Sequence, residues 1–133
     1  ADKEKEYRAL VLSNLVAIYQ KNELGKLSAY CGAVSAATGA GAGIAYLHGA
    51  DFDTIAETIT NTLANVSGIA AKIASSVDAA IMAYYMAAEH RGFQSGEGLV
   101  KKDVEATIKS FGRMGREGMR STDVEILKIM LEP

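Results

Sequence analysis

The sequence predicts an all-α protein, a multi-helix bundle with a central helix built from small residues. Only one proline occurs in the 133 residues, and because it is the last residue, no internal position is barred from a helix by a proline ring. Apolar residues recur three and four positions apart through most of the chain, and no convincing alternating β-strand pattern is present. A composition of 49% hydrophobic and 23% charged residues is typical of a globular protein, so residues 1–133 are expected to form one helical domain.

The first helix is predicted from about residue 3 to residue 22, closed by Asn22 and Gly25. Its apolar side chains recur at helical spacing. They are Leu10, Leu12, Leu15, Val16, Ile18 and Tyr19.

The second helix lies within residues 28–50, which read SAYCGAVSAATGAGAGIAYLHGA and contain the only cysteine, Cys31. Each glycine inside a helix costs about 1 kcal/mol relative to alanine, so a glycine-rich helix needs compensation. Small residues allow another backbone or a ligand to approach closely, and Gly39 and Gly43 form a GxxxG pair. We therefore expect this helix in the middle of the bundle.

The remaining helices are shorter or have clearer ends. Asp53 is a plausible N-cap for a helix carrying Ile55, Ile59, Leu63 and Val66. Another helix covers residues 70–90, with Ile73, Val77, Ile81 and Tyr84 on one face. A turn-rich connector over residues 92–99 leads to a helix at about 102–112. A short last helix starts at Ser121 or Thr122.

Charge and hydropathy exclude several classes of protein. A formal charge of −2 and a pI near 5.7 argue against a nucleic-acid-binding protein. The opening ADKEKEYR has no apolar core and is not a signal peptide. Residues 27–50 carry no formal charge, so a transmembrane helix is a rival interpretation, but leucine, isoleucine and phenylalanine are sparse there. One cysteine cannot form an internal disulfide, which favours a reducing, cytoplasmic location.

Several possible chemical motifs are weak when read alone. GAGAG lacks the spacing and the lysine of a phosphate-binding loop. His48 and His90 are isolated, which suits ordinary helix-end residues better than metal ligands. Lys72 beside Ser75 and Ser76 could form a Ser–Lys pair or a Schiff-base lysine, but a polar helix face is the favoured interpretation.

The arginine-rich stretch FGRMGREGMR leaves two interpretations open. Arg113, Arg116 and Arg120 could clamp a carboxylate, or they could lie at a solvated helix junction. The five methionines are expected to fill the core. They are Met82, Met86, Met114, Met119 and Met130.

Four separated segments together resemble one known family. They are SAYCGAVSAATGAGAGIAYLHGAD, TITNTLANVSGI, AAKIASSVDAAI and GLVKKDVEATIKSFGRMGREGMRSTDVEILKIM. In this order they resemble the C-terminal part of the L-serine dehydratase alpha-chain superfamily, in the branch related to L-cysteine desulfidase. The resemblance covers nearly all of the chain from Gly25 onward. Because members of that superfamily are considerably longer, it implies that residues 1–133 are the C-terminal part of a longer chain.

The resemblance implies a cytoplasmic lyase that uses a four-iron–four-sulfur cluster. Such enzymes eliminate water from L-serine or hydrogen sulfide from L-cysteine and release pyruvate and ammonia. Three cysteines hold the cluster, and its fourth iron stays open to act as a Lewis acid. On this resemblance Cys31 is the cofactor-binding and metal-ligating residue. The small-residue helix that follows it would let the backbone come close to the cluster.

One departure from the superfamily concerns the junction between Ile69 and Ala70. Relatives are expected to carry a longer, glycine-containing loop there, with the other two cluster cysteines. Either that loop is deleted in this chain, or it is missing from the sequence as it stands. In both cases the chain supplies Cys31 alone, so we predict that it holds no cluster by itself.

Two functional classes follow from these observations. The first is the catalytic portion of an iron–sulfur-dependent amino-acid lyase, with a small-molecule substrate and no nucleic-acid or membrane partner. The second is a non-catalytic helical packing or assembly module on the same fold. Homo-oligomerisation is possible in both, and the sequence does not distinguish serine from cysteine as substrate. Four polar residues next to the motifs could face the cluster cavity. They are Ser28, Asn61, Asn65 and Lys72.

Overall fold

The computed structural model describes residues 2–24, 32–66, 73–118 and 120–131, and every regular element within these ranges is a helix. This confirms the all-α prediction. The elements in chain order are α1 (Lys3–Leu24), α2 (Gly32–Leu47), α3 (Phe52–Val66), α4 (Ile73–Ala88), α5 (Val104–Arg113), a short π-helical turn η1 (Met114–Gly118) and α6 (Arg120–Leu131).

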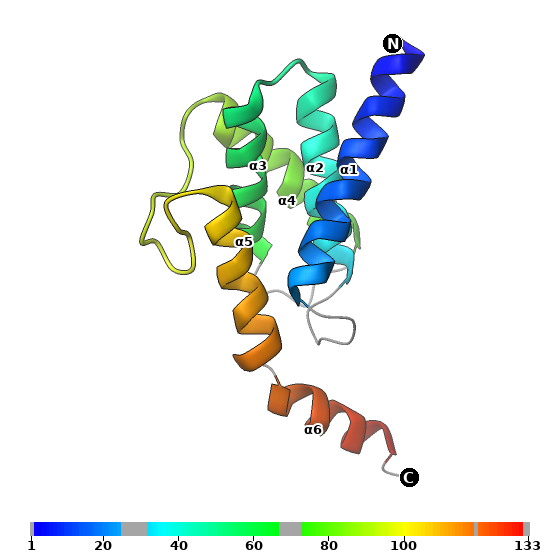
Figure 1. Cartoon of the computed structure of the whole chain (residues 1–133), viewed down its shortest axis with the longest axis vertical. Helices are drawn as coiled ribbons and strands as arrows, with labels where there is room; N and C mark the ends of the chain where they lie inside the picture. The colour runs from blue at the N-terminus through cyan, green and yellow to red at the C-terminus, as the bar shows by residue number, and fades with distance from the viewer. Residues whose placement is uncertain (1, 25–31, 67–72, 119, 132–133) are drawn as a thin grey trace.

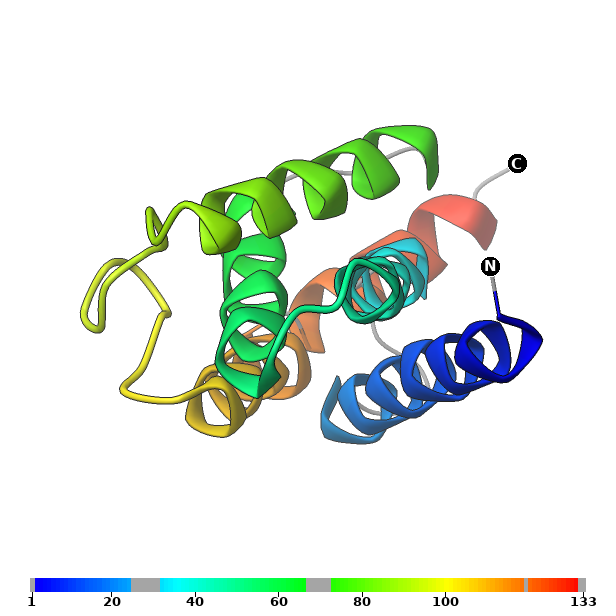
Figure 2. The ribbon, with the colours of Figure 1, turned by 90° about the horizontal axis from the view of Figure 1, so that it is seen from above.

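Helix α2 is the centre of the bundle, as the small residues of its sequence predict. It packs against α1, α3 and α4, and Figure 2 shows these three helices arranged around it. Helix α5 closes the bundle by packing on α1 and α3, whereas α6 extends away from the other helices (Figure 1). None of the described helices is both long enough and apolar enough to cross a membrane.

The glycines of α2 allow its neighbours to approach closely. A methyl group added at Gly39 would overlap the backbone carbonyl oxygen of Ser13 on α1. One at Gly43 would lie 3.0 Å from the Ala9 carbonyl oxygen, and one at Gly41 would lie 3.0 Å from the Ala80 side chain on α4. The GxxxG pair therefore serves helix packing with α1, and in this part of α2 it is a protein backbone that approaches.

The prediction that Asp53 caps α3 is wrong by two residues. The side chain of Asp51 accepts a hydrogen bond from the Thr54 amide at 2.9 Å, and the helix begins at Phe52. This hydrogen bond is the main reason that the pKa of Asp51 lies below its usual value. Asp53 instead lies in the first turn, where a carboxylate still interacts favourably with the helix dipole.

Several apolar residues that the sequence predicted to be buried, on α1 and at two methionines, are exposed in the structure. The side chains of Leu10, Leu15 and Ile18 are more than half exposed, although their spacing is that of a buried stripe. Met82 and Met130 are also exposed, so they are not the core residues that the sequence predicted. The buried core consists instead of Val34, Ala42, Ile59, Leu63, Ile108 and Phe111.

Candidate functional site

Three of the sequence-predicted site residues lie outside the described residues. They are Cys31, Ser28 and Lys72. The described chain enters α2 at Gly32, directly after Cys31, so the first turn of α2 is the structural landmark closest in sequence to the thiol.

Asn61 is a structural residue. Its side chain is fully buried; the amide oxygen accepts a hydrogen bond from the Phe93 backbone at 3.0 Å, and the amide nitrogen donates to the Ala83 carbonyl at 3.4 Å. These two bonds tie α3 to α4 and to the connector after it. Asn65, one turn later, is half-buried, and its amide nitrogen lies 3.9 Å from the Met86 sulfur, a weak acceptor.

Several helix ends meet on the side of the bundle where the chain approaches Cys31. The chain leaves α1 and α3 and enters α2 at the end of these helices that points toward α6 in Figure 1. The short turn between α2 and α3 lies at the opposite end. The last turn of α1 and the first turn of α2, which begins one residue after Cys31, therefore lie at the same end of the bundle.

At this end, two buried polar side chains lack partners among the described residues. Gln20 on α1 is 1% exposed and Ser35 on α2 is 4% exposed, yet neither the Gln20 amide nor the Ser35 hydroxyl forms a hydrogen bond there. Sequence reasoning missed both residues.

The register of α1 against α2 places these two side chains at the same level. Gly43 faces Ala9 and Ser13, and Gly39, one turn earlier, faces Ser13 and Ala17. One further turn toward the start of α2 is Ser35, which therefore lies opposite the turn of α1 that contains Gln20. Both belong to the small-residue interface between the two helices.

Gln20 and Ser35 are exceptional among the buried polar residues of this bundle. The buried threonine hydroxyls donate to carbonyl oxygens one turn earlier in their own helices, such as Thr38 to Val34 at 2.8 Å and Thr62 to Thr58 at 2.7 Å. A buried polar group without a partner costs about 1–3 kcal/mol, so natural proteins rarely keep one without a reason. An amide can donate and accept hydrogen bonds, and so can a hydroxyl, so either group could bind a carboxylate or an amino group.

We expect Gln20→Leu to stabilise the protein by about 1–3 kcal/mol, because it removes an unpartnered amide and keeps a similar volume. The measurement is the free energy of unfolding in urea. Asn61→Leu is the matched control, since it removes a buried amide with two hydrogen bonds and should destabilise. A loss of stability in Gln20→Leu would contradict the account, because it would mean that the amide already has a partner.

The arginine-rich stretch matches the solvated helix junction rather than a clamp. Arg113 donates to Glu117 at 3.0 Å, and Arg116 lies 3.6 Å from Glu23 on α1. Both guanidinium groups are well exposed and already paired with carboxylates. The side chain of Arg120 lies outside the described residues.

The two histidines occupy helix ends, as the sequence predicts. His48 follows the last residue of α2, and its ring lies 5.5 Å from that of Tyr84. His90 follows the end of α4 with a positive φ of 54°. The described residues include no cluster of three or more histidine, cysteine, aspartate or glutamate side chains that could hold a metal ion.

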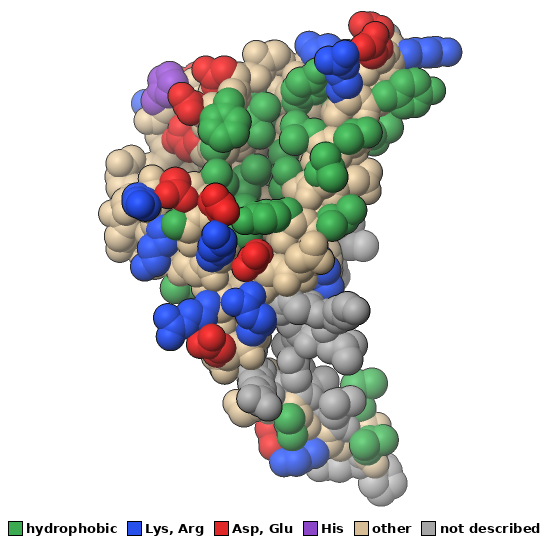
Figure 3. Space-filling view, viewed as in Figure 1, with side chains coloured by type: hydrophobic (Ala, Val, Ile, Leu, Met, Phe, Trp, Pro, Cys, Tyr) green, Lys and Arg blue, Asp and Glu red, His purple; other side chains and the backbone are tan. Residues whose placement is uncertain are grey.

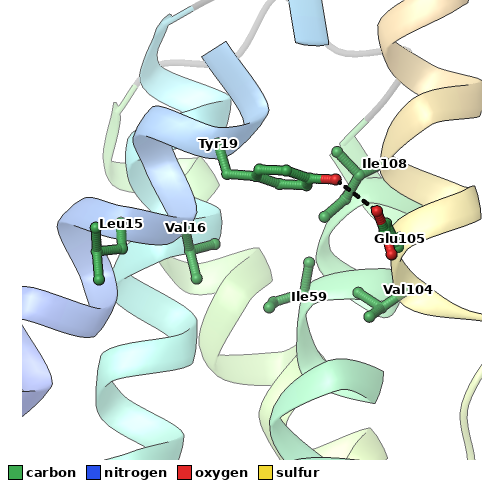
Figure 4. Close-up of a pocket in the computed structure, with 7 residues that line it drawn as sticks. All are labelled: Leu15, Val16, Tyr19, Ile59, Val104, Glu105 and Ile108. Carbon is green, nitrogen blue, oxygen red and sulfur yellow. Dashed lines mark hydrogen bonds between the residues drawn. The ribbon is translucent and has the colours of Figure 1, made fainter. Parts of the chain in front are cut away.

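A separate open groove of about 390 Å³ lies between α1, α3 and α5 (Figure 4). Its lining is apolar except at one side, where the Tyr19 hydroxyl donates to Glu105 at 3.2 Å. Lys109 donates a hydrogen bond to the same carboxylate, and together with the bond from Tyr19 it lowers the pKa of Glu105. The pKa of Tyr19 is raised by partial desolvation and by the Glu105 carboxylate. At neutral pH the groove therefore offers an ionised carboxylate and a neutral phenol. This suits packing against an apolar partner better than proton transfer.

The profile of a family described as "Serine dehydratase alpha chain" matches residues 1–128. The chain belongs to this family. This one match spans nearly all of the four separated sequence segments that resemble the superfamily.

Several similar curated proteins carry the name UPF0597 protein. One from Lachnoclostridium phytofermentans is 56% identical over 137 residues, covering 96% of this chain and 33% of that protein. Others from Desulfitobacterium hafniense and Finegoldia magna are 50% and 46% identical, covering 96% and 98% of this chain but 32% and 34% of their own length. This chain thus spans about a third of the length of these relatives. No solved structure matches it.

The donor set of this chain does not fit a four-iron–four-sulfur cluster. Such a cluster is held by several cysteine thiolates, and the sequence contains a single cysteine. Cys31 can supply one ligand, and the others would have to come from residues that this chain does not contain.

Proposed function

We propose that this chain is the catalytic C-terminal portion of an iron–sulfur-dependent amino-acid lyase. The reaction is the α,β-elimination of L-serine or L-cysteine. It releases water or hydrogen sulfide and leaves an enamine, whose imine tautomer is hydrolysed to pyruvate and ammonia. Membership of the serine dehydratase alpha chain family supports a lyase lineage.

The observation that carries this proposal is the pair of buried, unpartnered side chains Gln20 and Ser35. They lie at the level of the first turn of α2, which follows Cys31 directly. A module that served only for packing would gain stability by replacing them with apolar residues. A binding site would keep them, because functional sites retain groups that cost stability.

In this proposal the chain contributes only part of the site. Cys31 supplies one thiolate, and Gln20 and Ser35 supply polar atoms that can hold the carboxylate or amino group of the substrate. The remaining thiolates come from the rest of the protein. The alignments with relatives extend over 136 to 140 residues, more than the 133 of this chain, so the relatives contain positions that it lacks. This is in keeping with the longer loop expected between Ile69 and Ala70. A cluster of this kind also suits a reducing, cytoplasmic location.

The second candidate function is a non-catalytic helical packing module. The single cysteine favours it, since a chain that has lost the other cluster ligands has lost the chemistry and could keep the fold.

The test uses the complete protein, prepared without oxygen and supplied with iron and sulfide. If the lyase proposal is correct, the protein becomes brown and releases pyruvate from L-serine or L-cysteine, and the faster of the two reactions identifies the substrate. A colourless protein that releases pyruvate from neither amino acid would favour the packing module.

A further inference from the structure

Between Ala9 and Tyr19, helix α1 carries apolar side chains on most of its circumference. The side toward the bundle carries Ala9 and Val16, which pack near α2 and the core. The opposite side carries five large apolar side chains that are 56–67% exposed, namely Tyr7, Leu10, Val11, Leu15 and Ile18. We refer to these five residues as the α1 face. A helix that is apolar all round is normally buried on all sides.

The α1 face has the pattern of a packing surface rather than of a solvated one. Tyr7, Val11, Leu15 and Ile18 follow one another at intervals of four, four and three residues, so they form one stripe along the helix. No charged residue occurs between Arg8 and Lys21. The polar Asn14 within the stripe donates to the Leu10 carbonyl of its own helix at 2.8 Å.

Apolar grooves extend the α1 face on both sides. The groove toward α5 is the one shown in Figure 4, and Leu15 and Tyr19 line it from α1. The groove toward α2 has a volume of about 460 Å³ and is lined by Leu10, Ile44 and Leu47, among others. In Figure 3 apolar side chains gather along α1 and across toward α3, with charged groups mainly at the margins. Exposed apolar surfaces of this extent usually mark an interface.

We propose that the α1 face is an internal interface, covered in the complete protein by the polypeptide that relatives carry beyond the matched third. This chain covers only 32–34% of the length of those relatives, so about twice as much polypeptide is available to pack on it. In that arrangement α1 lies between two layers of helices. The proposal holds whether or not the protein is a lyase.

A second copy of this chain fits the surface less well. If two α1 helices packed together, each would cover the central stripe, but the grooves toward α2 and α5 would stay open. A partner with several apolar helices can fill the stripe and both grooves together. Packing of this kind also explains why α1 has no charged residue between Arg8 and Lys21 although it is otherwise the edge helix of the bundle.

The test measures how fast single cysteines react with a maleimide, peptide by peptide, in the complete protein and in this chain alone. In this chain alone, Leu15→Cys should react as fast as Met82→Cys, a matched control on α4 that is 58% exposed where Leu15 is 59% exposed. In the complete protein, Leu15→Cys should react at least about 100-fold more slowly than Met82→Cys, because its thiol would be reached only through local opening.

Each other outcome overturns the proposal. Equal reaction rates at both positions in the complete protein would show that the α1 face remains open to solvent. Protection of Leu15→Cys in this chain alone, increasing with protein concentration, would show that a second copy covers the face. Leu15→Glu provides an independent readout: it should lower the urea midpoint of the complete protein while leaving that of this chain nearly unchanged.

Discussion

Replacing Gly39 by alanine is expected to destabilise the protein by about 2 kcal/mol or more, one of the largest effects of any single methyl group in the bundle. The added methyl would overlap the Ser13 carbonyl oxygen and press on the Ala17 side chain. The oxygen belongs to the backbone of α1, and the Ala17 methyl has no other rotamer, so neither group can move away by side-chain rotation. Helices α1 and α2 would have to move apart along the interface that also contains Gln20 and Ser35.

The sign of this effect separates packing from intrinsic helix propensity. Alanine is favoured over glycine inside a helix by about 1 kcal/mol, so propensity alone predicts that the substitution stabilises. Gly32→Ala is the control, since an added methyl there meets no atom within 4 Å. We expect that variant to match or slightly exceed the native protein in urea unfolding. A Gly39→Ala protein as stable as Gly32→Ala would mean that α1 does not approach α2 as closely as described.

The central position of α2 could be predicted from sequence because its composition has one simple physical explanation. A run of glycine, alanine, serine and threonine covers little apolar surface, so it forms a stable helix only where neighbours come very close. The caps were harder to place. Asp51 and Asp53 flank the same helix start, and only the backbone geometry determines that Asp51 accepts the bond from Thr54.

The orientation of α1 could not be predicted from apolar spacing. A helix with apolar residues on both sides has no stripe that identifies its inward face, so Leu10 and Leu15 resemble core residues although they are exposed. A better signal was available in the small residues Ala9, Ser13 and Ala17. Their spacing of four matches that of Gly39 and Gly43 on α2.

Only part of the candidate site could be predicted from the sequence. Cys31 stood out as the single thiol in a family motif, whereas Gln20 is one glutamine among ordinary helix residues. Its position after Ala17, on the side of α1 that faces α2, is the signal that could have revealed it. An amide on a stripe of small inward residues must be buried, and a buried amide needs a partner.

If the proposed lyase function is correct, replacing Cys31 by alanine in the complete protein removes both the iron–sulfur cluster and the release of pyruvate. In the proposed site Cys31 supplies one of the thiolates that hold the cluster, and this chain contains no other cysteine that could replace it. Ala36→Ser, a change of similar size at an exposed position of α2, is the control and should leave the iron content unchanged.

Iron and acid-labile sulfide in the complete protein, purified without oxygen, provide the most direct measurement. We predict the amounts of one four-iron–four-sulfur cluster per chain in the native and Ala36→Ser proteins, and nearly none in Cys31→Ala. Equal iron and sulfide in the native and Cys31→Ala proteins would contradict the assignment of Cys31 as a cluster ligand, and with it the catalytic role proposed for this end of the bundle.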